Sequence, residues 1–548
     1  MRTAFRAKAK HREELSQVRS LPSPIGGWNA RDALALMPPT DAVILDNFMP
    51  KASYCELRGG FVSHVSGVAV DLLTEGGTDL TTESGDFLAT EDVATAIGGT
   101  IKTLAVYNGL NGLNKLFAIT EQGVYDVSTA GPVGPILIAR TDGKHQWTMF
   151  GDGTSNWLIA ANGIDKILYY DGTTWTAVDG GTSPALTNLD TTRIIGMMAH
   201  QGRLFFLEKG SLSFWYLPPA VAGGALTEFD LSSQAKRGGY LVAMGSWTRD
   251  AGDGQDDVAV FVTSEGEAII YQGDNPSQAN AWNKIGSFYV GRPLGRRCLT
   301  QLGGDLIILT ENGAFPLSVA LQSAILSYTS ALSNKIEKAF TEIARTTGSV
   351  FGWEAIIYQG QQALIVNVPI AEDGLHYQYV MNTLTKAWCR FTGWDAETFA
   401  LFNKELYFAR GSSVYKAWVG AIDGTDNIIS YGKQAFSYFG STSIKFFKMM
   451  RPILNVNGNI TYQASIDVDF EDTPILNTSS SAGVSGAIWD VSQWDNCFWA
   501  GELVPVKQWT TIAKFPGFCA APKLQISTNF LSVQWMSTDV MFEKGAVY

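Results

Sequence analysis

Short apolar stretches alternate with polar turns through the middle of the chain. In each case an apolar stretch leads into a turn that contains glycine, and a second apolar stretch follows, as at residues 116–127, 157–170 and 260–271. The apolar stretches are rich in Val, Ile, Phe and Tyr, which favour strands. Glycine at the turn allows the positive φ that a tight hairpin requires. The pattern therefore predicts a series of β-hairpins.

The turn glycines recur at intervals of 40 to 56 residues. They are Gly123, Gly163, Gly210, Gly266, Gly313, Gly360 and Gly411. A period of this length with several short strands in each unit is typical of a β-propeller. The turn at Gly360 fits least well, so the prediction is six or seven blades. A row of unrelated hairpins in β-sandwiches is the alternative.

The pattern changes after about residue 420. Alternating strands at 460–470 and 524–535 flank a loop rich in Ser and Gly, which indicates a separate antiparallel β domain. The predicted fold is all-β, with four parts: an N-terminal arm and extended segment (1–62), an acidic β insert (63–100), a six- or seven-bladed β-propeller (101–420) and a C-terminal antiparallel platform or sandwich-like domain (421–548).

One helix is predicted, over residues 334–345. Ile336, Phe340 and Ile343 fall at i, i+4 and i+7 beneath a Lys/Glu surface.

Two acidic patterns stand out. Residues 74–92 repeat a Thr-Glu-containing octad, and the region between Arg58 and Lys102 has seven acids and no Lys or Arg. This pattern fits either a solvated acidic loop or short strands with a special role. Asp467, Asp469 and Glu471 alternate, so they are predicted to share one face of a strand, either solvated or as a cation site.

Composition excludes several classes of protein. The 548 residues are 46% hydrophobic and 17% charged with a net charge of −12, which is unlike a disordered chain or a protein that grips nucleic acid along its phosphates. The five cysteines are far apart and form no C-x-x-C pair, which favours free thiols in a reducing compartment. No apolar run approaches the roughly 20 residues of a membrane span, and the basic N-terminus has no apolar stretch typical of a secretory signal.

Motifs for common enzyme chemistry are absent from the sequence. None of the five histidines lies three or four residues from another His or a Cys, and neither a G-x-S-x-G elbow nor a G-x-x-x-x-G-K-[ST] loop occurs. We therefore expect no catalytic residues, no metal and no cofactor. A propeller glycan hydrolase, with paired carboxylates from distant loops, stays open as an alternative.

The most specific stretch is near the N-terminus. It contains Gly26-Gly-Trp-Asn29, then Asn47, then Arg58 with Gly60. In this pattern the chain resembles the tail nozzle proteins of short-tailed bacteriophages, of the tail tubular protein B and packaged-DNA stabilising type. The runs at 310–318 and 535–547 are also similar to that family, whereas the acidic insert has no match in it.

This resemblance implies a function. It suggests a β-propeller with a β platform, in a non-enzymatic homo-hexamer below the portal and adaptor of the virion tail, assembled in the host bacterial cytoplasm. The central channel would hold the packaged genome and let double-stranded DNA pass without specific binding. The implied partners are the adaptor protein and tail fibres or tailspikes. A receptor-binding or fibre-attaching tail component is the alternative.

Two sets of residues are candidates for this role. Within the insert, Asp71, Glu75, Asp79 and Glu83 are hypothesised to face the channel or a neighbouring subunit, which the ejection rate of a variant with four lysines there would check. The first 20 residues carry six basic side chains against two glutamates, a local charge of +4. Their hypothesised role is to dock on the adaptor, which tail incorporation of a chain lacking them would check; a loose terminus is the alternative. The candidate docking residues are Arg2, Arg6, Lys8, Lys10 and Arg12.

Overall fold

A computed structural model describes residues 16–65, 97–248, 257–322, 328–475, 478–481, 503–512 and 516–545. The chain is nearly all-β, as predicted. It divides into two compact units: Gly59–Asp426, and Met1–Arg58 together with Asn427–Tyr548. We call the first unit the propeller and the second the β unit.

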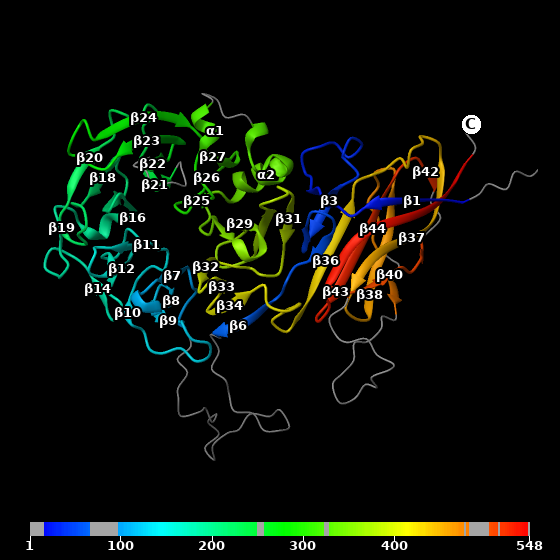
Figure 1. The fold of residues 1–548 in the computed structure, drawn as a ribbon, viewed down its shortest axis with the longest axis horizontal. Coiled ribbons are helices and arrows are strands. Elements are labelled where there is room, and N and C mark those ends of the chain that lie inside the picture. The colour runs from blue at the N-terminus through cyan, green and yellow to red at the C-terminus, as the bar shows by residue number, and fades with distance from the viewer. Residues whose placement is uncertain are drawn as a thin grey trace, which may run out of the picture. The chain divides into compact units, whose positions relative to one another are not determined.

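The propeller has seven blades among its described residues, arranged around a central axis (Figure 1). From the innermost strand outward, the blades are β7 (Thr103–Tyr107), β8 (Lys115–Ile119), β9 (Gly123–Asp126), β10 (Ile138–Ala139); β11 (Gln146–Gly151), β12 (Asn156–Ala161), β13 (Leu168–Tyr170), β14 (Trp175–Ala177); β16 (Ile194–His200), β17 (Arg203–Glu208), β18 (Ser213–Tyr216), β20 (Thr227–Asp230); β21 (Leu241–Thr248), β22 (Asp257–Thr263), β23 (Glu267–Gly273), β24 (Trp282–Tyr289); β25 (Leu299–Leu302), β26 (Asp305–Thr310), β27 (Gly313–Pro316); β28 (Glu354–Tyr358), β29 (Ala363–Pro369), β30 (His376–Asn382), β31 (Trp388–Phe391); and β32 (Thr398–Phe402), β33 (Glu405–Arg410), β34 (Ser413–Ala417), β6 (Phe61–Val65). A short parallel ribbon joins β15 (Leu186–Thr187) to β19 (Gly224–Ala225).

The last blade closes the ring with a strand from the other end of the chain. Strand β6 pairs antiparallel with β34, with Phe61 opposite Ala417, and β35 (Ile422–Asp423) adds a parallel pairing of Asp423 with Phe61. The first and last blades are thereby joined through one sheet, which removes a free sheet edge. The propeller thus includes residues before the predicted boundary at 101.

Six of the seven turn glycines occupy equivalent places. Gly163, Gly210, Gly266 and Gly411 have positive φ between the second and third strands of their blades, as the hairpin pattern predicts. Gly360 differs, because it lies in a 3₁₀ turn between the first and second strands, β28 and β29. In that blade the loop between the second and third strands contains Gly374 instead.

Aromatic side chains pack between adjacent blades. Phe214 of the third blade stacks on Phe261 of the fourth, with ring centroids 4.5 Å apart, and both are buried. Tyr271 and Trp282 extend this cluster, stacked at 5.2 Å. Buried aromatic area of this kind holds neighbouring blades together.

The predicted helix is confirmed. A 3₁₀ turn at Asn334–Ile336 leads into α2 (Glu337–Thr347), which follows α1 (Leu317–Gln322) in the chain. Ile336 and Phe340 are buried, as expected, but the buried face continues through Ala344 and Thr347 rather than Ile343. The remaining 3₁₀ turns are Leu110–Gly112, Thr191–Arg193, Tyr328–Ser330 and Gln359–Gln361.

The β unit consists of two antiparallel sheets plus short additions. One contains β1 (Gln17–Pro22), β4 (Phe48–Pro50), β5 (Cys55–Leu57), β37 (Lys445–Val456), β40 (Val504–Val506), β41 (Thr510–Thr511), β42 (Pro516–Gly517) and β44 (Val533–Lys544). The other runs β2 (Gly27–Trp28), β3 (Asp41–Asp46), β36 (Asp426–Gln434), β43 (Ala520–Thr528), β38 (Ile460–Val468) and β39 (Thr478–Ser481). The sheets face each other where Trp535 lies over Gly432, at which a Cβ would come within 2.5 Å of the indole ring.

The N-terminal segment is built into this unit rather than standing alone. Strand β1 pairs with β44, Gln17 opposite Phe542, and β3 pairs with β36, Asp46 opposite Tyr431. The division at residue 62 drawn from the sequence therefore differs from the structural one. The first 15 residues and 66–96, which hold most of the predicted acidic insert, lie outside the described residues.

The predicted row of carboxylates is wrong. Strand β38 ends at Val468, and Asp469 and Phe470 take positive φ, so the alternation stops. Asp467 is fully buried, and its carboxylate oxygens lie 2.6 Å from Nζ of Lys433 and 2.6 Å from Nζ of Lys523. The cations beside Asp467 are thus two lysine ammonium groups.

Two further observations concern the described residues alone. Four cysteines, Cys55, Cys298, Cys389 and Cys519, are buried free thiols there. In the same part of the chain, no helix has the length and apolarity to cross a membrane.

Candidate functional site

Charged side chains gather at the propeller axis, where the innermost strands begin. Arg297, in the connection from β24 to β25, is at the centre of this group. Its Nη1 donates to Glu354 Oε2 and to Thr398 Oγ1, both at 2.9 Å. Its Nη2 donates to Thr103 Oγ1 at 2.7 Å and to the His145 carbonyl at 2.8 Å.

One guanidinium therefore connects five blades. Thr103, His145, Glu354 and Thr398 lie at the inner-strand starts of the first, second, sixth and seventh blades, and Arg297 itself precedes β25 of the fifth. Arginine suits this position because its planar fork presents several fixed donors and keeps its charge.

Glu354 is the buried counter-ion of Arg297. Its Oε1 accepts the backbone N–H of Phe399 at 2.6 Å. Burial raises the pKa of this carboxyl, and the charge and hydrogen bond of Arg297 oppose that rise.

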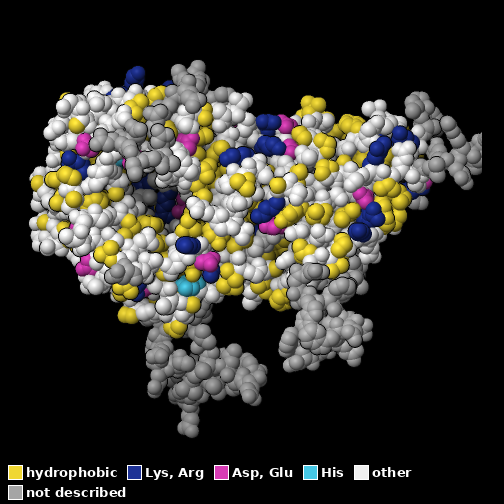
Figure 2. Space-filling view, in the orientation of Figure 1, with side chains coloured by type: hydrophobic (Ala, Val, Ile, Leu, Met, Phe, Trp, Pro, Cys, Tyr) yellow, Lys and Arg dark blue, Asp and Glu magenta, His cyan; other side chains and the backbone are white. Residues whose placement is uncertain are grey.

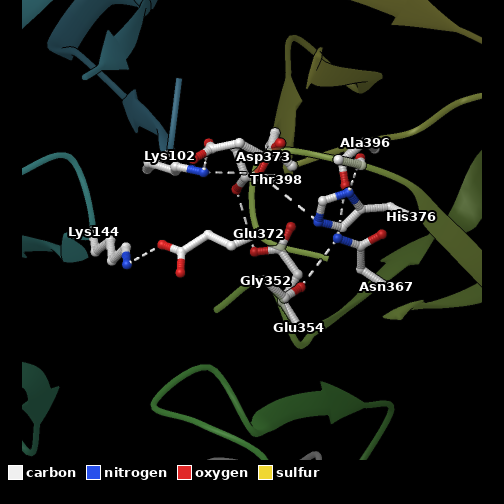
Figure 3. Close-up of polar contacts among 12 residues, drawn as sticks. Lys102, Lys144, Gly352, Glu354, Asn367, Glu372, Asp373, His376, Ala396 and Thr398 are labelled. Atoms are coloured by element: carbon white, nitrogen blue, oxygen red, sulfur yellow. Dashed lines mark hydrogen bonds and ion pairs between the residues drawn. The ribbon is translucent and has the colours of Figure 1, made fainter. Parts of the chain in front are cut away.

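A second ion cluster adjoins it (Figure 3). The Lys102 ammonium, itself buried, lies between the carboxylates of Asp373 and Glu397, with Glu397 Oε2 at 3.2 Å. Burial acts against the charge of Lys102, but the hydrogen bonds and charges of the two acids outweigh it and raise its pKa. Lys144 pairs with Glu372 beside this cluster.

Two buried histidines belong to the same region. His376 Nδ1 lies 2.8 Å from the Gly374 carbonyl, and its Nε2 lies 3.8 Å from Glu397 Oε2 (Figure 3). Burial lowers the pKa of His145 to about 3, so its imidazole is neutral at pH 7.

A cavity of about 300 Å³ adjoins the Arg297–Glu354 pair. Its wall includes residues from the innermost strands of six blades, among them Gln146, Met197, Met244, Leu299 and Ala355. The space-filling view shows a hollow in this half of the molecule with Lys and Arg side chains at its floor (Figure 2).

The ion network mainly fixes the blades at the axis. The buried carboxylates of Glu354 and Glu397 are each engaged by a cation, Arg297 and Lys102 respectively. No group of three or more His, Cys, Asp or Glu side chains suited to a metal occurs among the described residues.

The candidate residues from the sequence are not brought into this site. Asp71, Glu75, Asp79 and Glu83 lie outside the described residues, as do Arg2, Arg6, Lys8, Lys10 and Arg12, so both hypotheses stay predictions. Sequence reasoning missed the axial network. A usable signal existed, because Lys102, Arg297, Glu354 and Glu397 each stand at, or within two residues before, the start of an apolar inner strand.

The motif residues near the N-terminus form a buried polar network in the β unit. Asn29 Nδ2 donates to Asp41 Oδ2 at 2.8 Å and to Asp32 Oδ2 at 2.9 Å. A Cβ at Gly26 would stand 2.0 Å from Asp41 Oδ1, so only glycine fits there.

Asn47 and Arg58 form a second part of that network. Arg58 is 1% exposed and its Nε donates to Asn47 Oδ1 at 2.8 Å. Asn47 has a φ of 59° and donates from Nδ2 to the Ile429 carbonyl at 2.7 Å. Asparagine tolerates this left-handed conformation better than most residues.

Comparison with known proteins gives fold-level likeness. No family model and no curated protein matches the chain. Among solved structures, the β-propeller domain of Cps50 (Swd1) from Myceliophthora thermophila is similar over 59% of this chain and 99% of its own, with 13% identity and a TM-score of 0.35. BBS1N in complex with ARL6DN is similar over 66% and 96%, with 11% identity and a TM-score of 0.35. An exo-β-1,3-galactanase from Phanerochaete chrysosporium covers 86% and 100%, with 8% identity and a TM-score of 0.23. The chain is a β-propeller protein.

Proposed function

We propose that this chain is a structural component of a short bacteriophage tail. In this proposal six copies form a nozzle below the portal and adaptor, retain the packaged genome and let it pass at ejection. The role is structural rather than catalytic, and it needs no cofactor.

The observation that carries the proposal is the place of the motif residues. Gly26, Asn29, Asn47 and Arg58 are the residues in which the sequence resembles tail nozzle proteins, and they form one buried polar network. A chance match on exposed residues would have no such structural reason. The match therefore supports a shared fold of the β unit, and the function is inferred from that similarity.

The propeller supports the same role in a second way. Its blades are tied together at the axis by Arg297 and closed into a ring by β6. A module closed in this way resists distortion, which suits a part that withstands the passage of DNA under pressure.

Charge adds further support. A chain at −12 with few charged residues does not grip phosphates, so a channel of such chains would let a duplex slide. The acidic insert is proposed to face that channel or a neighbouring subunit, and the basic arm to dock on the adaptor.

Inactivating the gene in a phage that carries it tests the proposal. Heads should then package DNA and lose it, because the end of the channel is missing. The measurement is the DNA content of purified particles, with a complemented strain as control. Full, infectious particles without the chain would contradict the proposal, and full particles that fail only to adsorb would favour a receptor-binding component.

A further inference from the structure

The axial cavity carries one cation that the ion network does not neutralise. Arg296, next to Arg297 in the chain, lines the cavity. Its Nη1 donates to the Asn162 carbonyl at 3.0 Å, and no carboxylate lies within ion-pair distance of it among the described residues. Burial lowers the pKa of Arg296, which Asp142 opposes.

A second donor in the same wall also lacks a partner. The side-chain nitrogen of Gln146, at the first residue of β11, is buried without a hydrogen bond to any described residue. A buried donor left unpaired costs about 1–3 kcal/mol, so a ligand that accepts from it would bind favourably.

The acceptors nearby are already used. Glu354 Oε2 takes hydrogen bonds from Arg297 and Thr398, and its Oε1 takes one from the Phe399 N–H. The cavity therefore offers donors and a positive charge, and its complement is an anion with acceptor oxygens.

The rest of the wall is apolar. Met197, Leu207, Met244 and Leu299 line the cavity together with the indole of Trp147. Methionine side chains adapt to ligands of irregular shape. The volume of about 300 Å³ is at the lower end for small-molecule sites.

From these four observations we propose that the axial cavity binds a small monocarboxylate with an apolar body. The carboxylate accepts from Arg296 and Gln146, and the apolar body packs against Met197, Met244 and Leu299. This inference is independent of the role proposed above, since it concerns only the propeller.

Benzoate is the probe, with benzamide as the neutral match and inorganic phosphate as the anion without an apolar body. We expect benzoate to raise the melting temperature of the full chain and to bind, by calorimetry, with a dissociation constant of about 1 mM or tighter. Benzamide and phosphate should bind at least about tenfold more weakly, because each lacks one half of the recognition.

Variants assign the binding to this cavity. Arg296→Met should weaken benzoate binding at least about tenfold. Arg292→Met is the matched control, because Arg292 lies in the same connection but is exposed and paired with Glu265; it should bind benzoate as the wild type does.

A third variant keeps the test decisive if Arg296→Met fails to fold. Gly196→Leu fills the cavity from the opposite wall, where a Cβ would meet only Leu207 at 3.7 Å, and it should abolish benzoate binding. Equal binding of benzamide or phosphate, unchanged binding in Arg296→Met or Gly196→Leu, or no benzoate binding up to about 10 mM would each overturn the proposal.

Discussion

Replacing Arg297 by methionine is expected to lower the free energy of unfolding of the propeller by about 3–5 kcal/mol. The substitution keeps the apolar stem but leaves Glu354 buried without its counter-ion, and it removes hydrogen bonds to Thr103, Thr398 and His145. Urea unfolding followed by tryptophan fluorescence measures the change. The innermost strands of five blades lose their common contact, so the effect should be cooperative across the propeller.

The double variant Arg297→Met with Glu354→Gln separates charge from packing. Removing both charges should recover part of the loss, since the unpaired carboxylate is then gone. Arg292→Met, at an exposed ion pair of the same connection, should change stability by less than about 1 kcal/mol. Equal effects of Arg297→Met and Arg292→Met would contradict the central place of Arg297.

Replacing Asp467 by asparagine is expected to destabilise the β unit by about 3–5 kcal/mol. The Lys433 and Lys523 ammonium groups, 93% and 99% buried at the side chain, would lose the carboxylate between them. Asp472→Asn is the matched control, because Asp472 contacts both lysines but is 77% exposed, and it should cost less than about 1 kcal/mol.

The same group predicts a dependence on pH. Burial opposes the charge of Asp467, but hydrogen bonds from Lys433, Lys523 and Thr473 outweigh it and lower its pKa to about 2. A carboxylate with a lowered pKa stabilises the fold above its unfolded pKa of about 3.9 and loses that contribution as pH falls toward its folded value. The stability difference between wild type and Asp467→Asn should therefore be full at pH 6 and shrink between about pH 4 and pH 2. A difference that stays constant over this range would contradict the assignment.

The sequence reveals the propeller because its signal is local. A hairpin turn is encoded in a few neighbouring residues, and Gly163, Gly210, Gly266 and Gly411 each take the positive φ that the turn demands. Gly360 misled the pattern because a 3₁₀ turn between β28 and β29 also contains glycine. The number of blades still came within the predicted six or seven.

What the sequence does not reveal depends on distant pairing. Strand β1 meets β44 across more than 500 residues, and β6 closes a blade whose other strands begin at Thr398. No local periodicity encodes such partners. The row of acids ending at Glu471 failed for a related reason, since positive φ at Asp469 ends the strand, and two lysines from other strands meet Asp467.

The axial site shows the same limit. Arg297 and Glu354 are 57 residues apart, and each is an ordinary charged residue in the sequence. Only closure of the ring brings them together, and the resulting burial makes the pair important. The Asn47–Arg58 contact was more accessible, because both residues belong to a recognisable pattern near the N-terminus.

The copy number of this chain in purified phage particles tests the central claim most directly. Gel densitometry against the portal band provides it, with a head protein as the internal control. The account predicts half as many copies as a twelvefold portal, which is the ratio of a sixfold nozzle. A threefold number, as in a tail fibre, or absence of the chain from the particle would contradict the account.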